Sequence, residues 1–135
     1  MIHVIMGLKG SGKTKKLIDS VNATAATASG VVVCIEYGSK LTYDVKSSVR
    51  LVNSQEYGIS NSCMLKGLLS GLHAGNYDIT HVYIDNLYKT IGSDRAAGED
   101  FILWCADFAK ANNMEITVTV SDDAELASEA VKAYL

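Results

Sequence analysis

The chain has 135 residues, 48% of them hydrophobic, with 12 basic and 15 acidic residues and a formal net charge of −3 at pH 7. This length predicts a single domain that covers residues 1–135. No apolar run approaches the roughly 18 residues that a membrane span needs, so no membrane association is expected. The slightly acidic balance also disfavours nucleic acid as a partner.

The cysteines and the first residues indicate the expected compartment. The three cysteines, Cys34, Cys63 and Cys105, are odd in number, show no C-x-x-C spacing and fall in apolar segments. We therefore expect three buried free thiols, which are typical of a reducing compartment. Because no basic segment precedes an apolar core at the start, we expect no secretory signal and a cytoplasmic protein.

A glycine-rich motif follows the first predicted strand, residues 2–6. Residues 7–14, Gly-Leu-Lys-Gly-Ser-Gly-Lys-Thr, match the Walker A pattern G-x-x-x-x-G-K-[ST] at every fixed position. Residues 13–28 carry apolar side chains at spacings of four and are predicted to form a helix that Gly30 ends. A strand, a glycine-rich loop and a helix in this order are the context in which such a motif binds phosphate.

The residue types of this motif suit a nucleoside triphosphate. Its glycines allow the backbone to curl so that successive N–H groups point at a phosphate. Lys13 would place its charge between the β- and γ-phosphates, and the Thr14 hydroxyl would be a ligand of Mg²⁺. We therefore expect ATP or GTP, with Mg²⁺, as the cofactor. The predicted nucleotide-binding residues are Gly7, Gly10, Ser11, Gly12, Lys13 and Thr14.

The second predicted strand, residues 31–35, is an unbroken β-branched run of the kind that is covered on both faces of a sheet. It ends at Glu36, and α/β sheets place their chemistry at the carboxyl ends of such strands. Residues 39–48 are predicted to be a loop. Residues 49–52 alternate weakly and indicate a short edge strand.

A leucine-rich stripe predicts a helix from a cap at Ser62 to about Ala74. A turn then leads to a strand at residues 81–85 that ends in Asp85. An aspartate at this place after a Walker A motif is a Walker B candidate, whose carboxylate would hold Mg²⁺ together with Thr14. A simple turn residue is the alternative interpretation of Asp85.

The last third of the chain is predicted to contain a polar connection at residues 89–98, a helix at 99–111, a strand at 116–120 and a helix at 124–135. Ser121 follows the last strand directly. It is interpreted either as a residue that reaches the γ-phosphate or as part of a Ser121-Asp122 cap of the final helix.

The alternation of strands and helices predicts an α/β fold with three layers, a mostly parallel sheet with helices on both faces. The order of elements and the motif at residues 7–14 resemble the RecA-like division of P-loop NTPases over most of the chain. That resemblance implies the three-layer P-loop NTPase fold. It also implies that the strand at 116–120 lies between the strands at 2–6 and 81–85.

Within this division the chain is similar to short P-loop proteins of Firmicutes that are sometimes labelled as PilT-like twitching-motility proteins. RecA-type recombinases and PilT-type ATPases carry a glutamate that polarises the attacking water where this chain has Glu36, so the resemblance implies that Glu36 is the general base. The chain lacks the histidine box and the arginine fingers of the PilT type. Many ATPases of the division place a catalytic glutamate where this chain has Asn86, which cannot accept a proton at neutral pH.

A weaker resemblance is to the core of thymidine kinases, which share the order of elements up to an aspartate-bearing strand. Those enzymes have Asp-Glu where this chain has Asp85-Asn86, and they carry a four-cysteine zinc lasso that is missing here. A nucleoside pocket would have to come from the loop at residues 37–46.

Three functions remain open from the sequence. The first is Mg²⁺-dependent binding of ATP or GTP with slow hydrolysis, in a regulatory or assembly role. The second is phosphorylation of a nucleoside or another small molecule, and the third is a nucleotide-dependent switch without turnover. The protein partner is open between a second copy of the chain and another protein. Arg95 is either an arginine that acts across such a contact or a surface charge.

Overall fold

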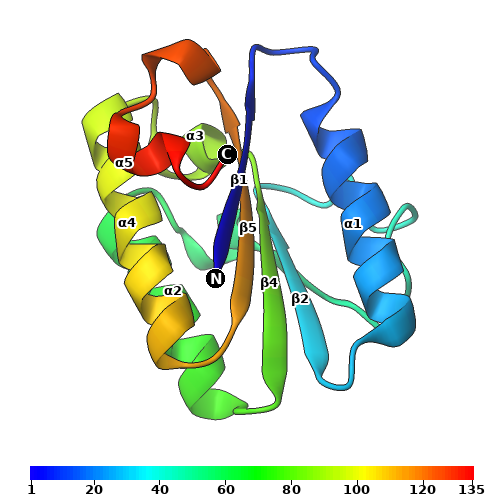
Figure 1. The fold of residues 1–135 in the computed structure, drawn as a ribbon. Helices are drawn as coiled ribbons and strands as arrows, with labels where there is room; N and C mark the ends of the chain where they lie inside the picture. The colour runs from blue at the N-terminus through cyan, green and yellow to red at the C-terminus, as the bar shows by residue number, and fades with distance from the viewer.

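A five-stranded parallel sheet forms the centre of the computed structural model, which describes all of residues 1–135. Every pair of neighbouring strands is parallel, and the order across the sheet is β1-β5-β4-β2-β3 (Figure 1). The strands are β1 (Ile2–Gly7), β2 (Val31–Glu36), β3 (Arg50–Asn53), β4 (Ile79–Asp85) and β5 (Glu115–Ser121).

Helices cover both faces of this sheet. Helix α1 lies alone on one face, and α2, α4 and α5 lie on the other (Figure 1). The helices are α1 (Lys13–Thr27), α2 (Ser62–Gly75), α3 (Leu87–Ile91), α4 (Arg95–Ala111) and α5 (Glu129–Lys132), with short 3₁₀ turns η1 (Ser54–Tyr57) and η2 (Ala124–Leu126). The predicted α/β architecture is thereby confirmed. None of the helices combines the length and the apolar character that crossing a membrane requires.

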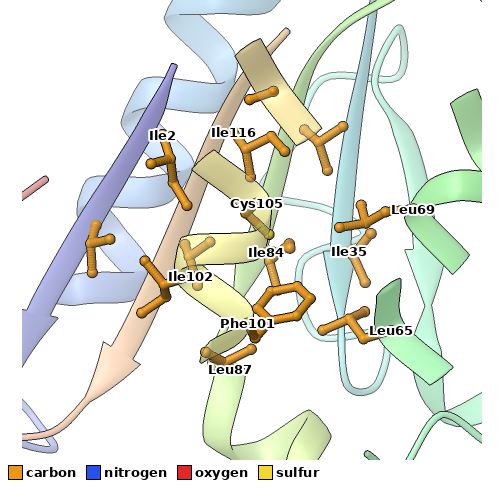
Figure 2. Packing of buried hydrophobic residues seen from close by; sticks show 14 of the residues in the cluster. Ile2, Ile35, Leu65, Leu69, Ile84, Leu87, Phe101, Ile102, Cys105 and Ile116 are labelled. Carbon is orange, nitrogen blue, oxygen red and sulfur yellow. The ribbon is translucent and has the colours of Figure 1, made fainter. Parts of the chain in front are cut away.

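The sheet separates two apolar clusters. The larger one lies under α2 and α4, where Figure 2 shows Leu65 of α2 and Phe101 of α4 packed near Ile35 and Ile84 of the sheet. On the other face, Leu17 of α1 belongs to a smaller cluster. Successive strand residues point to opposite faces, so strands buried on both faces read as continuous apolar runs.

The loop predicted at residues 39–48 contributes apolar side chains to the smaller cluster, which the sequence did not indicate. Leu41 and Val45 are buried there together with Val49. This segment packs beside α1 on the same face of the sheet. Its backbone is fixed by Asn22 of α1, which accepts a hydrogen bond from the Lys46 amide at 2.9 Å.

The strand order confirms the insertion expected from the sequence. Strand β5 pairs with β1 along one edge and with β4 along the other. The weak strand at 49–52 is also confirmed, since β3 is an edge strand paired with β2. Because all strands are parallel, their carboxyl ends meet at one edge of the sheet, and Glu36 of β2 is directly opposite Asp85 of β4.

Two helix boundaries differ from the prediction. Asn61 caps α2 in place of Ser62, because its side chain accepts a hydrogen bond from the Met64 amide at 2.9 Å. The predicted connection at 89–98 contains α3, and α4 begins at Arg95 instead of Glu99. Asp94 sets this earlier start, since its carboxylate caps α4 at Ala96 and Ala97.

The predicted continuous helix at 124–135 is wrong. The chain forms η2 and α5 separately, with extended backbone at Ala127 and Ser128 between them. Asp123 caps η2 and Ser128 caps α5, so neither Ser121 nor Asp122 is the cap. Ser128 also donates its amide to Glu99 at 2.7 Å, which holds the break in place.

The expectation of three buried thiols is correct for two of them. Cys34 and Cys105 are buried, whereas Cys63 is exposed at the start of α2. The buried face of that helix is made by Leu65 and Leu69. The apolar sequence around Cys63 therefore misled the prediction because an amphipathic helix turns part of its first turn to solvent.

Gly30 is predicted to be required by the close approach of two segments. A Cβ there would collide with the Thr80 side chain and lie 2.5 Å from the carbonyl oxygen of Asp78. Gly30→Ala should lower the free energy of unfolding by about 1–3 kcal/mol, because β2 must move away from β4. Urea denaturation would measure this change.

Gly71→Ala is the matched control, because an added Cβ at this position in α2 meets nothing within 4 Å. It should stabilise the protein by about 0.5–1 kcal/mol, the usual gain from replacing glycine inside a helix. Equal effects of the two substitutions would contradict the steric explanation for Gly30.

Candidate functional site

The loop at residues 7–14 connects the carboxyl end of β1 to the first turn of α1. Gly10 and Gly12 both have φ of +87°, which side-chain-bearing residues rarely adopt. Gly12 is also the N-cap of α1, and no side chain caps this helix end. The first amides of a 15-residue helix are therefore left for an external acceptor, and the helix dipole favours an anion there.

The Lys13 side chain closes over this loop. Its ammonium donates a hydrogen bond to the Leu8 carbonyl oxygen at 3.1 Å and to Ser11 Oγ at 3.5 Å. Only 9% of Lys13 is exposed. A Cβ at Gly7 would force the Ser11 hydroxyl out of its present position. The loop is thus folded around one positive charge.

An open pocket of about 360 Å³ lies in front of the loop. No hydrophobic residue lines it, and its lining contains three lysines against one carboxylate. The chemistry of the pocket favours a polyanionic ligand over an apolar one. The lining residues are Lys9, Gly10, Gly12, Lys13, Thr14, Lys15, Asp85, Asn86, Thr119 and Ser121.

Asp85 is the buried carboxylate of this pocket, with 9% exposure. Thr14 donates its hydroxyl toward both carboxylate oxygens at 3.3 and 3.4 Å. Thr119 of the inserted strand β5 donates to Asp85 Oδ1 at 2.9 Å and accepts the Asn86 amide at 2.6 Å. The structure therefore brings the two residues predicted to hold a metal into contact, and adds Thr119 as a support.

The Thr14 and Asp85 oxygens fit a hard divalent cation. Carboxylate and hydroxyl oxygens are ligands that Mg²⁺ accepts, and Mg²⁺ normally keeps several waters and takes phosphate oxygens as further ligands. The chain has no group of three or more His, Cys, Asp or Glu side chains that could hold a metal ion. A cation here would depend on the ligand for part of its coordination.

Glu36 lies beside this pocket and not inside it. It is 6% exposed, and its Oε1 accepts the Leu41 amide at 2.9 Å. Together with Thr14, Asp85 and Asn86 it lines a smaller cavity of about 140 Å³, which we call the adjoining cavity. The predicted base and the predicted metal ligands thus face the same small space.

The buried thiol next to these carboxylates is not a nucleophile. Burial raises the pKa of Cys34 to about 12, and the charges of Asp85 and Glu36 add to the shift. Because the thiolate is the reactive form of cysteine, Cys34 is inert at neutral pH.

The Asn86 side chain caps the start of helix α3. The residue has a left-handed conformation with φ of +61°, and its side chain accepts the Lys89 amide at 3.3 Å as the cap of α3. Positive φ in a residue other than glycine is concentrated at functional sites. One lone pair of the Asn86 amide oxygen is used inside the chain.

Arg95 is held within its own chain. Its guanidinium donates two hydrogen bonds to the Asp122 carboxylate at 2.8 and 3.0 Å, and Tyr88 donates to the same carboxylate at 3.1 Å. The hydrogen bond from Arg95 lowers the pKa of Asp122 to about 2. The fork is therefore occupied, which disfavours Arg95 as an arginine that reaches into another subunit.

Sequence reasoning missed several residues at this edge of the sheet. Thr119 lies in an alternating strand, where a threonine predicts only β structure. Lys40 and Lys89 line the adjoining cavity from a loop and from the short helix α3. Ser121 was not missed: it was offered from the sequence as a residue that reaches the γ-phosphate, and it lines the pocket in front of the loop. The signal for Thr119 was the predicted strand insertion, which placed the end of β5 next to the loop.

Comparison with known proteins does not assign the chain to a family. No protein-family model matches the sequence, and no curated protein matches it.

Thr119→Val is predicted to destabilise the site and the fold. The substitution keeps the shape but removes one donor from the buried carboxylate of Asp85 and the acceptor of the partly buried Asn86 amide. The free energy of unfolding should fall by about 1–3 kcal/mol, the cost of leaving buried polar groups unpaired. Urea denaturation would measure the loss.

Thr117→Val in the same strand is the control, because the Thr117 hydroxyl forms no hydrogen bond within the chain. It should change the stability less than Thr119→Val. Equal losses would mean that β-strand packing, and not the bond to Asp85, determines the effect.

Proposed function

We propose that this chain is a P-loop domain that binds ATP or GTP with Mg²⁺ and hydrolyses it slowly, in a regulatory or assembly role. The observation that carries the proposal is the contact of Thr14, at the end of the glycine-rich loop, with the buried carboxylate of Asp85. A loop that binds only an anion needs no carboxylate partner. A loop that binds a nucleotide together with a cation needs a carboxylate to hold that cation.

The composition of the pocket supports a triphosphate. Lys13 and the free first amides of α1 supply positive charge and N–H donors, and Asp85 with the Thr14 hydroxyl supplies oxygens. A chain of phosphates with a bound cation offers negative oxygens to the donors and a positive ion to the oxygens. Bound Mg²⁺ would neutralise the part of the phosphate charge that Lys13 and the α1 amides do not compensate.

The strand order supports the RecA-like form of the P-loop fold. One strand, β5, lies between the strand that leads into the loop and the strand that ends in Asp85. This is the arrangement that the resemblance to the RecA-like division implies. With no matching family model, the proposal depends on the motif and the geometry together.

Hydrolysis would use Glu36 as the base. A water in the adjoining cavity forms a bond from its oxygen to the γ-phosphorus, and Glu36 takes a proton from that water. The bond between the γ-phosphorus and its bridging oxygen breaks, and the electron pair leaves with the diphosphate. The proton count closes when Glu36 returns its proton to solvent or to the product.

Slow turnover follows from the groups around this step. Asn86 cannot accept a proton and caps α3, so it does not replace the glutamate found there in many ATPases of the RecA-like division. Arg95 is bound to Asp122 and does not stabilise charge on the transferred group. A low basal rate suits a regulatory or assembly role better than a motor.

A small-molecule kinase is the second candidate, and a separate pocket favours it. A pocket of about 320 Å³ also has Glu36 in its wall, with Thr42, Arg50, Asn53 and Tyr57 around it. A hydroxyl compound bound there would approach the same carboxylate as the attacking water. Screening nucleosides and small metabolites for ATP-dependent phosphorylation would distinguish transfer to a hydroxyl from hydrolysis.

Lys13→Ala should weaken ATP binding by about tenfold to a hundredfold, because it removes a charged donor from a largely buried anion site. Isothermal titration calorimetry with MgATP would measure the affinity. Lys16→Ala is the control, since Lys16 lies next to the motif but lines none of the described pockets. Unchanged affinity in the Lys13 variant would defeat the proposed function.

Glu36→Gln should leave MgATP affinity unchanged and lower the rate of phosphate release by about a hundredfold, the usual contribution of a general base. The amide oxygen of glutamine can still accept the Leu41 amide, so the fold is preserved. Steady-state phosphate release at saturating MgATP would measure the rate. A rate equal to that of the wild type would remove Glu36 from the proposed step.

A further inference from the structure

The adjoining cavity is larger than the attacking water of the proposed function requires. It shares Thr14, Asp85 and Asn86 with the pocket in front of the glycine-rich loop, so the two spaces lie side by side. Its volume of about 140 Å³ exceeds what one attacking water needs, since a water occupies about 30 Å³ of liquid. The remaining space needs an explanation.

Two ammonium groups line this cavity without a carboxylate partner. Lys40 comes from the loop after β2, and Lys89 comes from α3, so two separate segments bring positive charge to one place. Neither forms a salt bridge, as is true of most lysines in this chain, so both charges remain available to a ligand. The Lys89 ammonium lies 6.0 Å from the centre of the Tyr37 ring, which also lines the cavity.

Two carboxylates line the same cavity. Glu36 and Asp85 are both largely buried, and Asp85 already accepts hydrogen bonds from Thr14 and Thr119. Glu36 uses only Oε1, for the Leu41 amide, and Oε2 has no hydrogen-bond partner in the chain. A ligand must therefore offer negative oxygens to the lysines and a proton donor to Glu36.

Monohydrogen phosphate has both of these features. Its unprotonated oxygens can accept hydrogen bonds from the lysines, and its one P–OH group can donate to Glu36 Oε2. Sulfate has the same tetrahedral shape but no proton at neutral pH. Placed against Glu36, it would bring two acceptors together with no hydrogen between them.

We propose that the adjoining cavity is a second anion site that binds orthophosphate, or a phosphate group, beside the bound nucleotide through Lys40, Lys89 and Glu36. The inference depends on the proposed function, because the nucleotide fills the neighbouring pocket. The phosphate has two sources. It is either the γ-phosphate after its release or the phosphate group of a second compound.

Calorimetric titration of sodium orthophosphate into the protein saturated with MgADP tests the site. The wild type should bind orthophosphate and should not bind sulfate at the same concentrations. The double variant Lys40→Gln/Lys89→Gln should bind orthophosphate about tenfold more weakly, as expected for the loss of charged donors. Lys46→Gln is the matched control, an exposed lysine of the same loop that lines none of the described pockets.

Titration in the presence of Mg²⁺ and AMP-PNP, a nonhydrolysable ATP analogue, distinguishes the two sources. Orthophosphate that binds with MgADP but not with the analogue identifies the site as that of the released γ-phosphate. Orthophosphate that binds equally in both complexes identifies a site for a second compound's phosphate group. Either result supports the second anion site.

Three results would overturn this inference. They are no orthophosphate binding in the MgADP complex, equal affinity for sulfate, and equal orthophosphate affinity in the double variant and the wild type. MgADP affinity is measured in the same samples. A wild type that binds MgADP but no orthophosphate disproves the second anion site alone, whereas failure to bind MgADP or MgATP disproves the proposed function.

Discussion

The buried carboxylate of Asp85 is the constraint around which the carboxyl edge of the sheet is built. Burying an ionised carboxylate is costly unless hydrogen bonds or a cation compensate it. Here the compensation comes from the Thr14 hydroxyl on α1 and the Thr119 hydroxyl on β5. Asp85 thereby connects the glycine-rich loop, the inserted strand and the start of α3, and it determines where a cation and a polyanion can meet.

The insertion of β5 between β1 and β4 makes this arrangement possible. Adjacent strands lie about 4.8 Å apart, so the inserted strand separates β1, which leads into the loop, from β4, which ends in Asp85, by roughly twice that distance. That width leaves room for the pocket of about 360 Å³. The end of β5 supplies Thr119 and Ser121 to the wall, so the inserted strand both spaces the site and supplies groups to it.

The fold and the loop could be predicted from the sequence because their signals are local. Buried parallel strands read as apolar runs, and the motif at 7–14 needs fixed residues at fixed spacings. The adjoining cavity could not be predicted, since Lys40 and Lys89 are 49 positions apart and meet only after β2 and β4 pair. The break between η2 and α5 was not predicted, because Ser128 is held there by a hydrogen bond to Glu99, which is 29 residues away in the sequence.

The turn after β4 links the two proposals, slow hydrolysis and a second anion site. Asn86 takes a left-handed conformation and caps α3, so the chain reverses into a helix directly after Asp85. That reversal brings Lys89, three residues later, to the cavity beside Glu36. A glutamate at position 86 would offer a base, but glutamate caps helices and adopts positive φ less readily than asparagine. Under the proposed function, the same residue would therefore withhold one catalytic group and position the Lys89 ammonium, which would favour retention of phosphate over rapid turnover.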